Sequence, residues 1–121
     1  MVDIWYTSKV FRGTGGGKKL GFPTINLDPS KFVGDLKEGV YSCLVDYKNS
    51  IYLGALYFGP RFISNETELI LEIYMVDFDK EIYGKTVEFK VGEFIREAKK
   101  FSDTKSLIEQ IKKDVEKIRS L

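Results

Sequence analysis

A short polar segment is the first place in this chain where side chains could do chemistry. Thr24 and Asn26 stand two residues apart within Leu20-Gly21-Phe22-Pro23-Thr24-Ile25-Asn26-Leu27. Because side chains alternate along an extended backbone, the hydroxyl and the amide point to one side and offer two neutral oxygen ligands to Mg²⁺ or to a phosphate-bound water. Spacing alone favours the plainer alternative, an ordinary Thr and Asn at a strand end.

A glycine-rich run, Gly13-Thr14-Gly15-Gly16-Gly17-Lys18-Lys19, lies directly before this segment. Glycines lack side chains, so their backbone N–H groups can approach an anion closely, and two lysine ammonium groups stand beside them. The run is not a Walker A sequence, because no glycine-lysine-hydroxyl unit opens a helix here. It is either a phosphate-binding loop or a flexible surface loop, and composition leaves both open.

Glu72 is the one charged residue in the apolar run Leu69 to Val76. Burying an ionised carboxylate is costly without a partner, and apolar surroundings raise the pKa of a carboxyl group. Such a group can accept the proton of an alcohol during phosphoryl transfer. Glu72 is therefore a candidate general base, with an outward-facing strand carboxylate as the alternative.

The chain contains no histidine, which removes Ser-His-Asp and Cys-His catalysis and histidine proton shuttles. Any chemistry must then use carboxylates, hydroxyls, amines or backbone groups, with positioning and electrostatics as the main means. Phosphoryl transfer, assisted by a hard cation with oxygen ligands, fits that set.

Composition predicts a single domain over residues 1–121, since 43% of the residues are hydrophobic and 31% are charged. A formal net charge of +1 gives no broad footprint for nucleic acid or an anionic membrane, and Cys43, as the sole cysteine, excludes an intrachain disulfide. Without a signal peptide or a membrane-spanning run, we expect a cytoplasmic location and a monomer.

Apolar residues alternate with the period of β-strands between positions 38 and 91. Strands are predicted over 41–47, 51–58, 69–78 and 85–91, with Lys48-Asn49-Ser50 as a hairpin turn. The pieces 4–6 and 9–11 could add another strand. Several short strands at close spacing indicate a small barrel.

The apolar period changes to that of a helix from Thr104 onward. Ser102 or Asp103 can cap its first turn. The apolar stripe of this predicted helix consists of Leu107, Ile108, Ile111, Val115 and Ile118. We expect the stripe to dock on the barrel.

Taken in order, these motifs resemble the riboflavin kinase family, which also forms the C-terminal domain of bifunctional FAD synthetases. The resemblance covers nearly the whole chain. It rests on the glycine-rich run, 20–27, Glu38-Gly39-Val40-Tyr41, Glu72 with Asp77-Phe78, Ile82-Tyr83-Gly84, Ile95-Arg96, Phe101 and the final helix. It implies a mainly β fold, a six-stranded antiparallel Greek-key barrel with a C-terminal α-helix.

The resemblance also implies an activity, the transfer of phosphate from ATP to riboflavin to make FMN and ADP. Glu72 would be the general base, Thr24 and Asn26 would hold Mg²⁺, and Arg96 and Phe101 would lie near the flavin. The implied nucleotide-binding residues are Gly13, Gly15, Gly17, Lys18, Gly21, Pro23, Thr24 and Asn26. Arg96 could equally form an ion pair at a strand end.

Three positions depart from the family's usual pattern. The family usually has Arg at Lys18, often has His at Tyr74, and has Pro-Thr-Phe where Gly59-Pro60-Arg61-Phe62 appears. A lysine replaces a planar bidentate fork by a point charge, so nucleotide affinity could be weaker. The candidate residues Thr24, Asn26 and Glu72 are all retained.

Two other kinds of protein compete with the kinase interpretation. One is a non-catalytic barrel that binds flavin or nucleotide, and the other is a barrel that binds single-stranded nucleic acid. The near-neutral charge weighs against the second, so no nucleic-acid or membrane partner is expected. The chain begins close to the glycine-rich run and leaves no room for an adenylyltransferase domain, so FAD synthesis is not expected, and Met1 favours a stand-alone protein.

Overall fold

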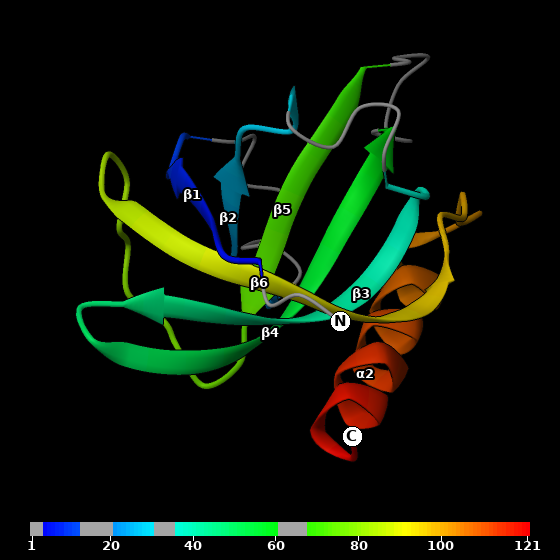
Figure 1. Cartoon of the computed structure of the whole chain (residues 1–121). Helices are drawn as coiled ribbons and strands as arrows, with labels where there is room; N and C mark the ends of the chain where they lie inside the picture. The colour runs from blue at the N-terminus through cyan, green and yellow to red at the C-terminus, as the bar shows by residue number, and fades with distance from the viewer. Residues whose placement is uncertain (1–3, 13–20, 31–35, 61–67) are drawn as a thin grey trace.

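The computed structural model describes residues 4–12, 21–30, 36–60 and 68–121, which form six strands and one helix (Figure 1). These elements are β1 (Tyr6–Lys9), β2 (Thr24–Leu27), β3 (Gly39–Tyr47), β4 (Ser50–Pro60), β5 (Leu69–Met75), β6 (Thr86–Glu97) and α2 (Thr104–Arg119). The strands alternate buried and partly exposed residues over most of their length, as the sequence pattern predicts.

The strands form one antiparallel sheet in the order β1-β6-β3-β4-β5-β2. The sheet curls until its two edges meet: the Phe11 N–H donates to the Asn26 carbonyl at 2.8 Å, and the Asp28 N–H donates to Ser8 Oγ at 3.2 Å. This confirms the predicted mainly β, six-stranded antiparallel fold with a C-terminal helix, in the form of a curled half-barrel.

The predicted hairpin turn joins β3 to β4. Lys48 and Asn49 both have positive φ, 49° and 64°, and Tyr47 pairs with Ser50 across the two-residue loop. Two consecutive left-handed residues match the twist of the flanking strands, which is why such turns close β-hairpins.

Strand β6 continues six residues beyond the predicted end at Val91, as far as Glu97. The pairing of β6 with β3 is irregular between Val40 and Cys43, where the Glu93 N–H donates to Ser42 Oγ at 2.8 Å. A Cβ on Gly92 would lie 2.4 Å from that oxygen, so only glycine fits the irregularity. Glycine interrupts the alternation of apolar and polar side chains from which the strand was predicted, so the predicted strand ended too early. The irregularity also increases the local twist of the sheet.

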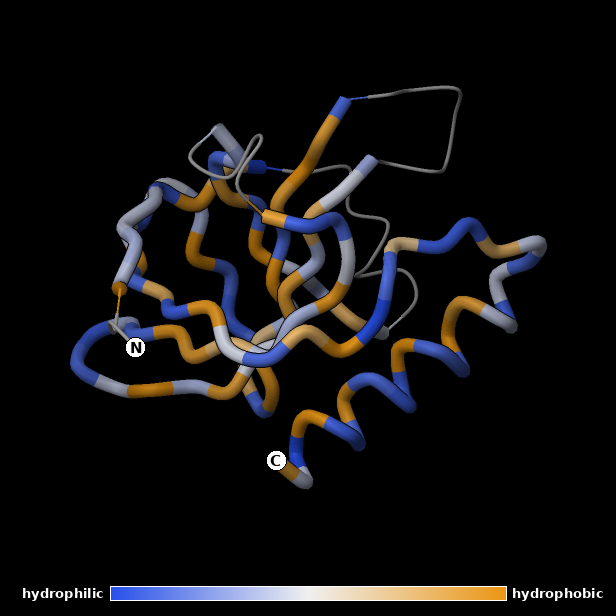
Figure 2. Tube along the Cα trace, turned by 45° about the vertical axis from the view of Figure 1, so that its right-hand side comes forward, coloured by the Kyte–Doolittle hydropathy of each residue, from blue (hydrophilic) through white to orange (hydrophobic). Residues whose placement is uncertain are grey.

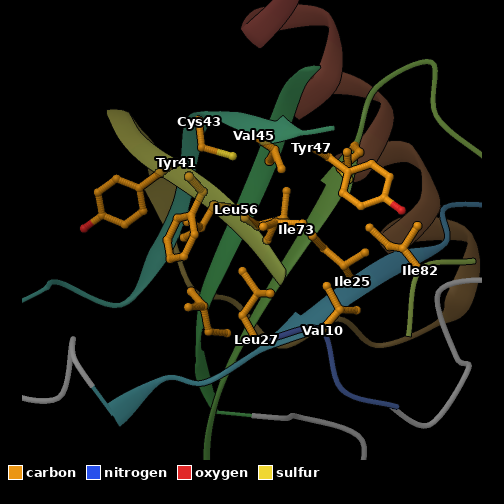
Figure 3. Packing of buried hydrophobic residues seen from close by; sticks show 14 of the residues in the cluster. Val10, Ile25, Leu27, Tyr41, Cys43, Val45, Tyr47, Leu56, Ile73 and Ile82 are labelled. Carbon is orange, nitrogen blue, oxygen red and sulfur yellow. The ribbon is translucent and has the colours of Figure 1, made fainter. Parts of the chain in front are cut away.

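The concave side of the sheet encloses the hydrophobic core (Figure 3). Leu56, Phe58, Leu71, Ile73 and Phe89 are among its most deeply buried side chains. Burial raises the pKa of the Cys43 thiol, so this buried cysteine stays protonated.

Helix α2 begins after Asp103, whose carboxylate accepts a hydrogen bond from the Ser106 N–H at 2.7 Å. The helix packs against β4 and β6 on the outside of the sheet, and apolar and polar residues alternate along it at the helical period (Figure 2). Ile118, from the predicted stripe, is buried. Within the ranges described, no helix combines the length and the apolar content that a membrane crossing needs.

Candidate active site

Strands β2 and β5 bring the three predicted residues Thr24, Asn26 and Glu72 together. Asn26 lies directly opposite Glu72 in the antiparallel register, and Thr24 Oγ1 donates to Glu72 Oε2 at 3.1 Å. Ile25 and Leu27, which alternate with Thr24 and Asn26, point into the core. The hydroxyl, the amide and the carboxylate therefore share the outer, partly exposed face of the sheet.

An aromatic pair borders this group on one side. Tyr74 lies opposite Thr24, and its ring meets that of Phe22 edge to face at a centroid distance of 5.3 Å. Tyr74 is one of the positions at which the chain departs from the usual family pattern, and here its ring packs against Phe22, the residue before Pro23. Gly21 has a φ of 86°, a left-handed conformation that suits glycine, and Pro23 is exposed.

Tyr57, on β4, borders the group on the other side, because it lies directly opposite Glu72. Its hydroxyl donates to the Pro60 carbonyl at 2.5 Å. Burial raises the pKa of Tyr57 to about 12, the negative charges of Glu72 and Glu38 add to the rise, and Arg96 opposes it. The phenol therefore keeps its proton at neutral pH and can donate to the Pro60 carbonyl.

Arg96 forms an ion pair with Asp114 on α2. Its Nη2 and Nε donate to the carboxylate at distances of 2.9 to 3.0 Å, and Gln110 Nε2 donates to the same carboxylate at 3.0 Å. The guanidinium also lies 5.6 Å from the centre of the Phe101 ring. Of the two roles considered for Arg96, the ion pair is present, and the flavin contacts of Arg96 and Phe101 remain predictions.

A cavity of about 590 Å³ lies beside the ends of β4, β5 and β6. It is lined by residues 36–38, Phe58, Leu69, Glu97 and Ala98. The cavity thus adjoins the segment between β6 and α2, where the sequence predicted a flavin site.

Several predicted residues lie outside the described part of the chain. These are Gly13, Gly15, Gly17 and Lys18 of the glycine-rich run, and Arg61 and Phe62 after β4. The proposed phosphate-binding role of the glycine-rich run therefore remains a prediction.

The donor set is compatible with Mg²⁺ that arrives with a nucleotide. The described residues contain no group of three or more His, Cys, Asp or Glu side chains able to hold a metal by themselves. Thr24 and Asn26 offer neutral oxygens beside one carboxylate, and Mg²⁺ commonly takes one or two protein ligands, with substrate phosphates and water as the others.

Two residues near the site were missed by sequence reasoning. Tyr57 resembles any partly buried strand aromatic, and the sequence carries no signal for its position beside Glu72. Asp114 did carry a signal, since it lies between Ile111 and Ile118 on the apolar stripe, and an acidic residue there calls for a cationic partner.

Comparison with known proteins is consistent with this arrangement. The family model described as "Flavokinase: Riboflavin kinase" matches residues 2–121. The chain is 37% identical over 107 residues to an RNA-binding riboflavin kinase of Bacillus subtilis, covering 88% of this chain and 46% of that protein. It is 33% identical over 118 residues to a bifunctional riboflavin kinase/FMN adenylyltransferase of Listeria monocytogenes, covering 95% of this chain and 38% of that protein. The chain thus spans less than half the length of these relatives.

Solved structures share the fold. A riboflavin kinase from Trypanosoma brucei superposes with a TM-score of 0.69 and 25% identity, covering 99% of this chain and 80% of that one. A Streptococcus pneumoniae structure titled as a macrolide-efflux protein gives a TM-score of 0.83 and 27% identity, covering 99% of this chain and 40% of that one. With a family model matching nearly every residue, this chain belongs to the riboflavin kinase family.

Proposed function

We propose that this chain transfers the γ-phosphate of ATP to the 5′-hydroxyl of riboflavin, producing FMN and ADP. The observation that carries the proposal is the hydrogen bond of 3.1 Å between Thr24 Oγ1 and Glu72 Oε2, with Asn26 paired to Glu72. Residues that are 46 and 48 positions apart in the sequence meet on one face of the sheet, and they are the residues that family resemblance assigns to nucleotide, metal and base.

In the proposed reaction, the riboflavin hydroxyl oxygen forms a bond to the γ-phosphorus. The bond from that phosphorus to the bridging oxygen of ATP breaks, and ADP leaves with the electron pair. The Glu72 carboxylate accepts the hydroxyl proton. The Thr24 hydroxyl, which donates to this carboxylate, keeps it directed toward the nucleotide side of the face.

Thr24 and Asn26 would hold Mg²⁺ together with the ATP phosphates, and the cation would neutralise the charge that develops on the transferred group. The residues around Thr24 and Asn26 would position these two side chains. Phe22 and Tyr74 pack together at the start of β2. Because Ile25 points into the core, the side chains of Thr24 and Asn26 on either side of it point outward, so their oxygens are held in place before ligands bind.

The flavin would lie toward the segment between β6 and α2. The cavity beside Glu97 and Ala98 offers room there, and Phe101 offers an aromatic ring. Arg96, near the end of β6, would contribute by joining β6 to α2 through Asp114.

The direct test is a Mg²⁺-dependent assay with riboflavin and ATP, in which chromatography separates FMN from riboflavin. Wild-type protein should form FMN, and Glu72→Gln should reduce kcat by roughly 100-fold or more, because a positioned general base contributes about that much. Glu88→Gln is the matched control, since Glu88 is an exposed carboxylate on β6, which pairs with β1 and β3 and not with the strands that carry the site.

Three results would contradict the proposal in different ways. Normal turnover by Glu72→Gln would remove Glu72 as the base. Equal losses in Glu72→Gln and Glu88→Gln would indicate a general effect of charge. Absence of FMN from the wild type, together with tight flavin binding, would identify a binding module in place of an enzyme.

A further inference from the structure

A row of five side-chain positions crosses the outer face of the sheet. Neighbouring strands pair Asn26 with Glu72, Glu72 with Tyr57, Tyr57 with Val40, and Val40 with Arg96. Residues directly opposite each other in antiparallel strands point to the same side. The row therefore runs from the proposed metal ligand at one end to the helix-bound arginine at the other, and Tyr57 is its central member.

The ring of Tyr57 is held in place at its far end. The hydroxyl donates to the Pro60 carbonyl, and a Cβ built on Gly59 would lie 3.0 Å from the hydroxyl oxygen and 3.4 Å from Ala98 Cβ. The phenol thus lies close over the backbone of Gly59, beside the segment that leads to α2. Glycine at position 59 leaves the room that the phenol needs.

This placement gives Tyr57 two neighbours that matter for the reaction. Glu72 lies opposite it on β5, and Ala98, which lines the 590 Å³ cavity, lies beyond Gly59. A partly buried ring at the cross-strand position beside a carboxylate occupies space on that side and so limits the directions in which the carboxylate can turn.

We propose that Tyr57 is a positioning residue for Glu72: its ring and its hydroxyl bond to Pro60 keep the carboxylate directed toward Thr24 and the phosphate-transfer side of the sheet. The inference rests on the proposed function and deepens it. Tyr57 itself takes no part in proton transfer. Its hydroxyl proton is donated to the Pro60 carbonyl, and its raised pKa, to about 12, keeps the phenol neutral.

The kinetic test compares Tyr57→Phe with Tyr52→Phe. Tyr52 is another partly buried tyrosine of β4, and its ring contacts Phe78 at a distance from Glu72. Tyr57→Phe should lower kcat about 10-fold and leave the KM for ATP within about twofold of wild type, while Tyr52→Phe should change neither. An unchanged kcat in Tyr57→Phe, or equal losses in both variants, would overturn the proposal.

A second measurement needs no turnover and keeps the inference separate from the kinase proposal. At one fixed pH, the ¹³Cζ resonance of Tyr57 should differ between wild type and Glu72→Gln and should be unchanged in Glu88→Gln, because Glu72 lies directly opposite Tyr57. No difference between wild type and Glu72→Gln would overturn the placement, even if FMN forms. A difference in a protein that forms no FMN would overturn the kinase proposal, and with it the role of Tyr57 in transfer, while the placement of Tyr57 beside Glu72 would stand.

Discussion

At the scale of single residues, one close packing constraint lies in the centre of the sheet, where β4 passes β3 and β5. A Cβ on Gly54 would lie 2.8 Å from Cys43 Sγ, 2.8 Å from Ile73 Cγ2 and 3.3 Å from the Tyr74 carbonyl oxygen. Cys43 and Ile73 are 2% and 0% exposed, so neither side chain can move outward. The β5 segment that carries Glu72 is thus packed closely against β4 from inside.

We expect Gly54→Ala to lower the free energy of unfolding by about 1–3 kcal/mol, the usual cost of adding a methyl group to a filled core. Urea denaturation would measure it. The double variant Cys43→Ala with Gly54→Ala should lose less than the sum of the single variants, because the sulfur is one of the two atoms in the way. Strict additivity would show that the sulfur does not limit the space.

At the scale of elements, two Arg–Asp pairs that differ in solvent exposure join α2 to the rest of the fold, one to β6 and one to the turn after β5. Arg96 and Asp114 have side chains that are 20% and 5% exposed, whereas Arg119 and Asp77 are 52% and 77% exposed. A buried charge that loses its partner is costly, but an exposed pair is screened by water and contributes little. The helix position therefore depends mainly on the pair near the segment 98–103.

Asp114→Ala should destabilise the protein by about 3–5 kcal/mol, since Arg96 would keep a largely buried charge without its partner. Arg119→Ala, which breaks the exposed pair without changing the left-handed residue Asp77, should cost about 0–1 kcal/mol. Denaturant unfolding of both variants gives the comparison. Similar losses of unfolding free energy in the two variants would mean that the burial of an ion pair does not decide how much it stabilises this protein.

At the scale of the whole molecule, the two edges of the curled sheet meet next to the proposed nucleotide site. The Phe11 N–H donates to the carbonyl of Asn26, whose side chain is a predicted metal ligand. A ligand that binds Thr24 and Asn26 would therefore stabilise the closed sheet as well as β2. Binding to the folded state alone raises the stability of the entire fold.

We expect Mg²⁺ with ADP, at about 100 times its Kd, to raise the unfolding free energy by roughly 2.7 kcal/mol. Thermal unfolding should show the rise, and chelation of Mg²⁺ should reduce it. Thr24→Val should abolish most of the effect, because it removes the oxygen and keeps the shape, while Glu72→Gln should retain it. A full effect in Thr24→Val would exclude that hydroxyl from the nucleotide site.

The sequence by itself determined the type of most elements and the candidate residues. The bounds of three strands differ from those predicted: β1 spans Tyr6–Lys9, β5 ends at Met75 and β6 extends to Glu97. Alternation of apolar residues predicted β3, β4 and β5, the change of period predicted α2, and the turn at Lys48-Asn49 followed from residue type. These features are local, because side-chain period and turn chemistry act over a few residues. The order of the motifs along the chain was enough to indicate the family.

Only the tertiary structure decided which of these residues meet. The pairing of Asn26 with Glu72, the place of Tyr57 beside Glu72, and the contact of Arg96 with Asp114 join parts of the chain that lie far apart. Strand register depends on the packing of the whole core, and a shift by one residue would turn every side chain to the opposite face. No local pattern records that choice, so the residue types were readable from the sequence while their geometry was not.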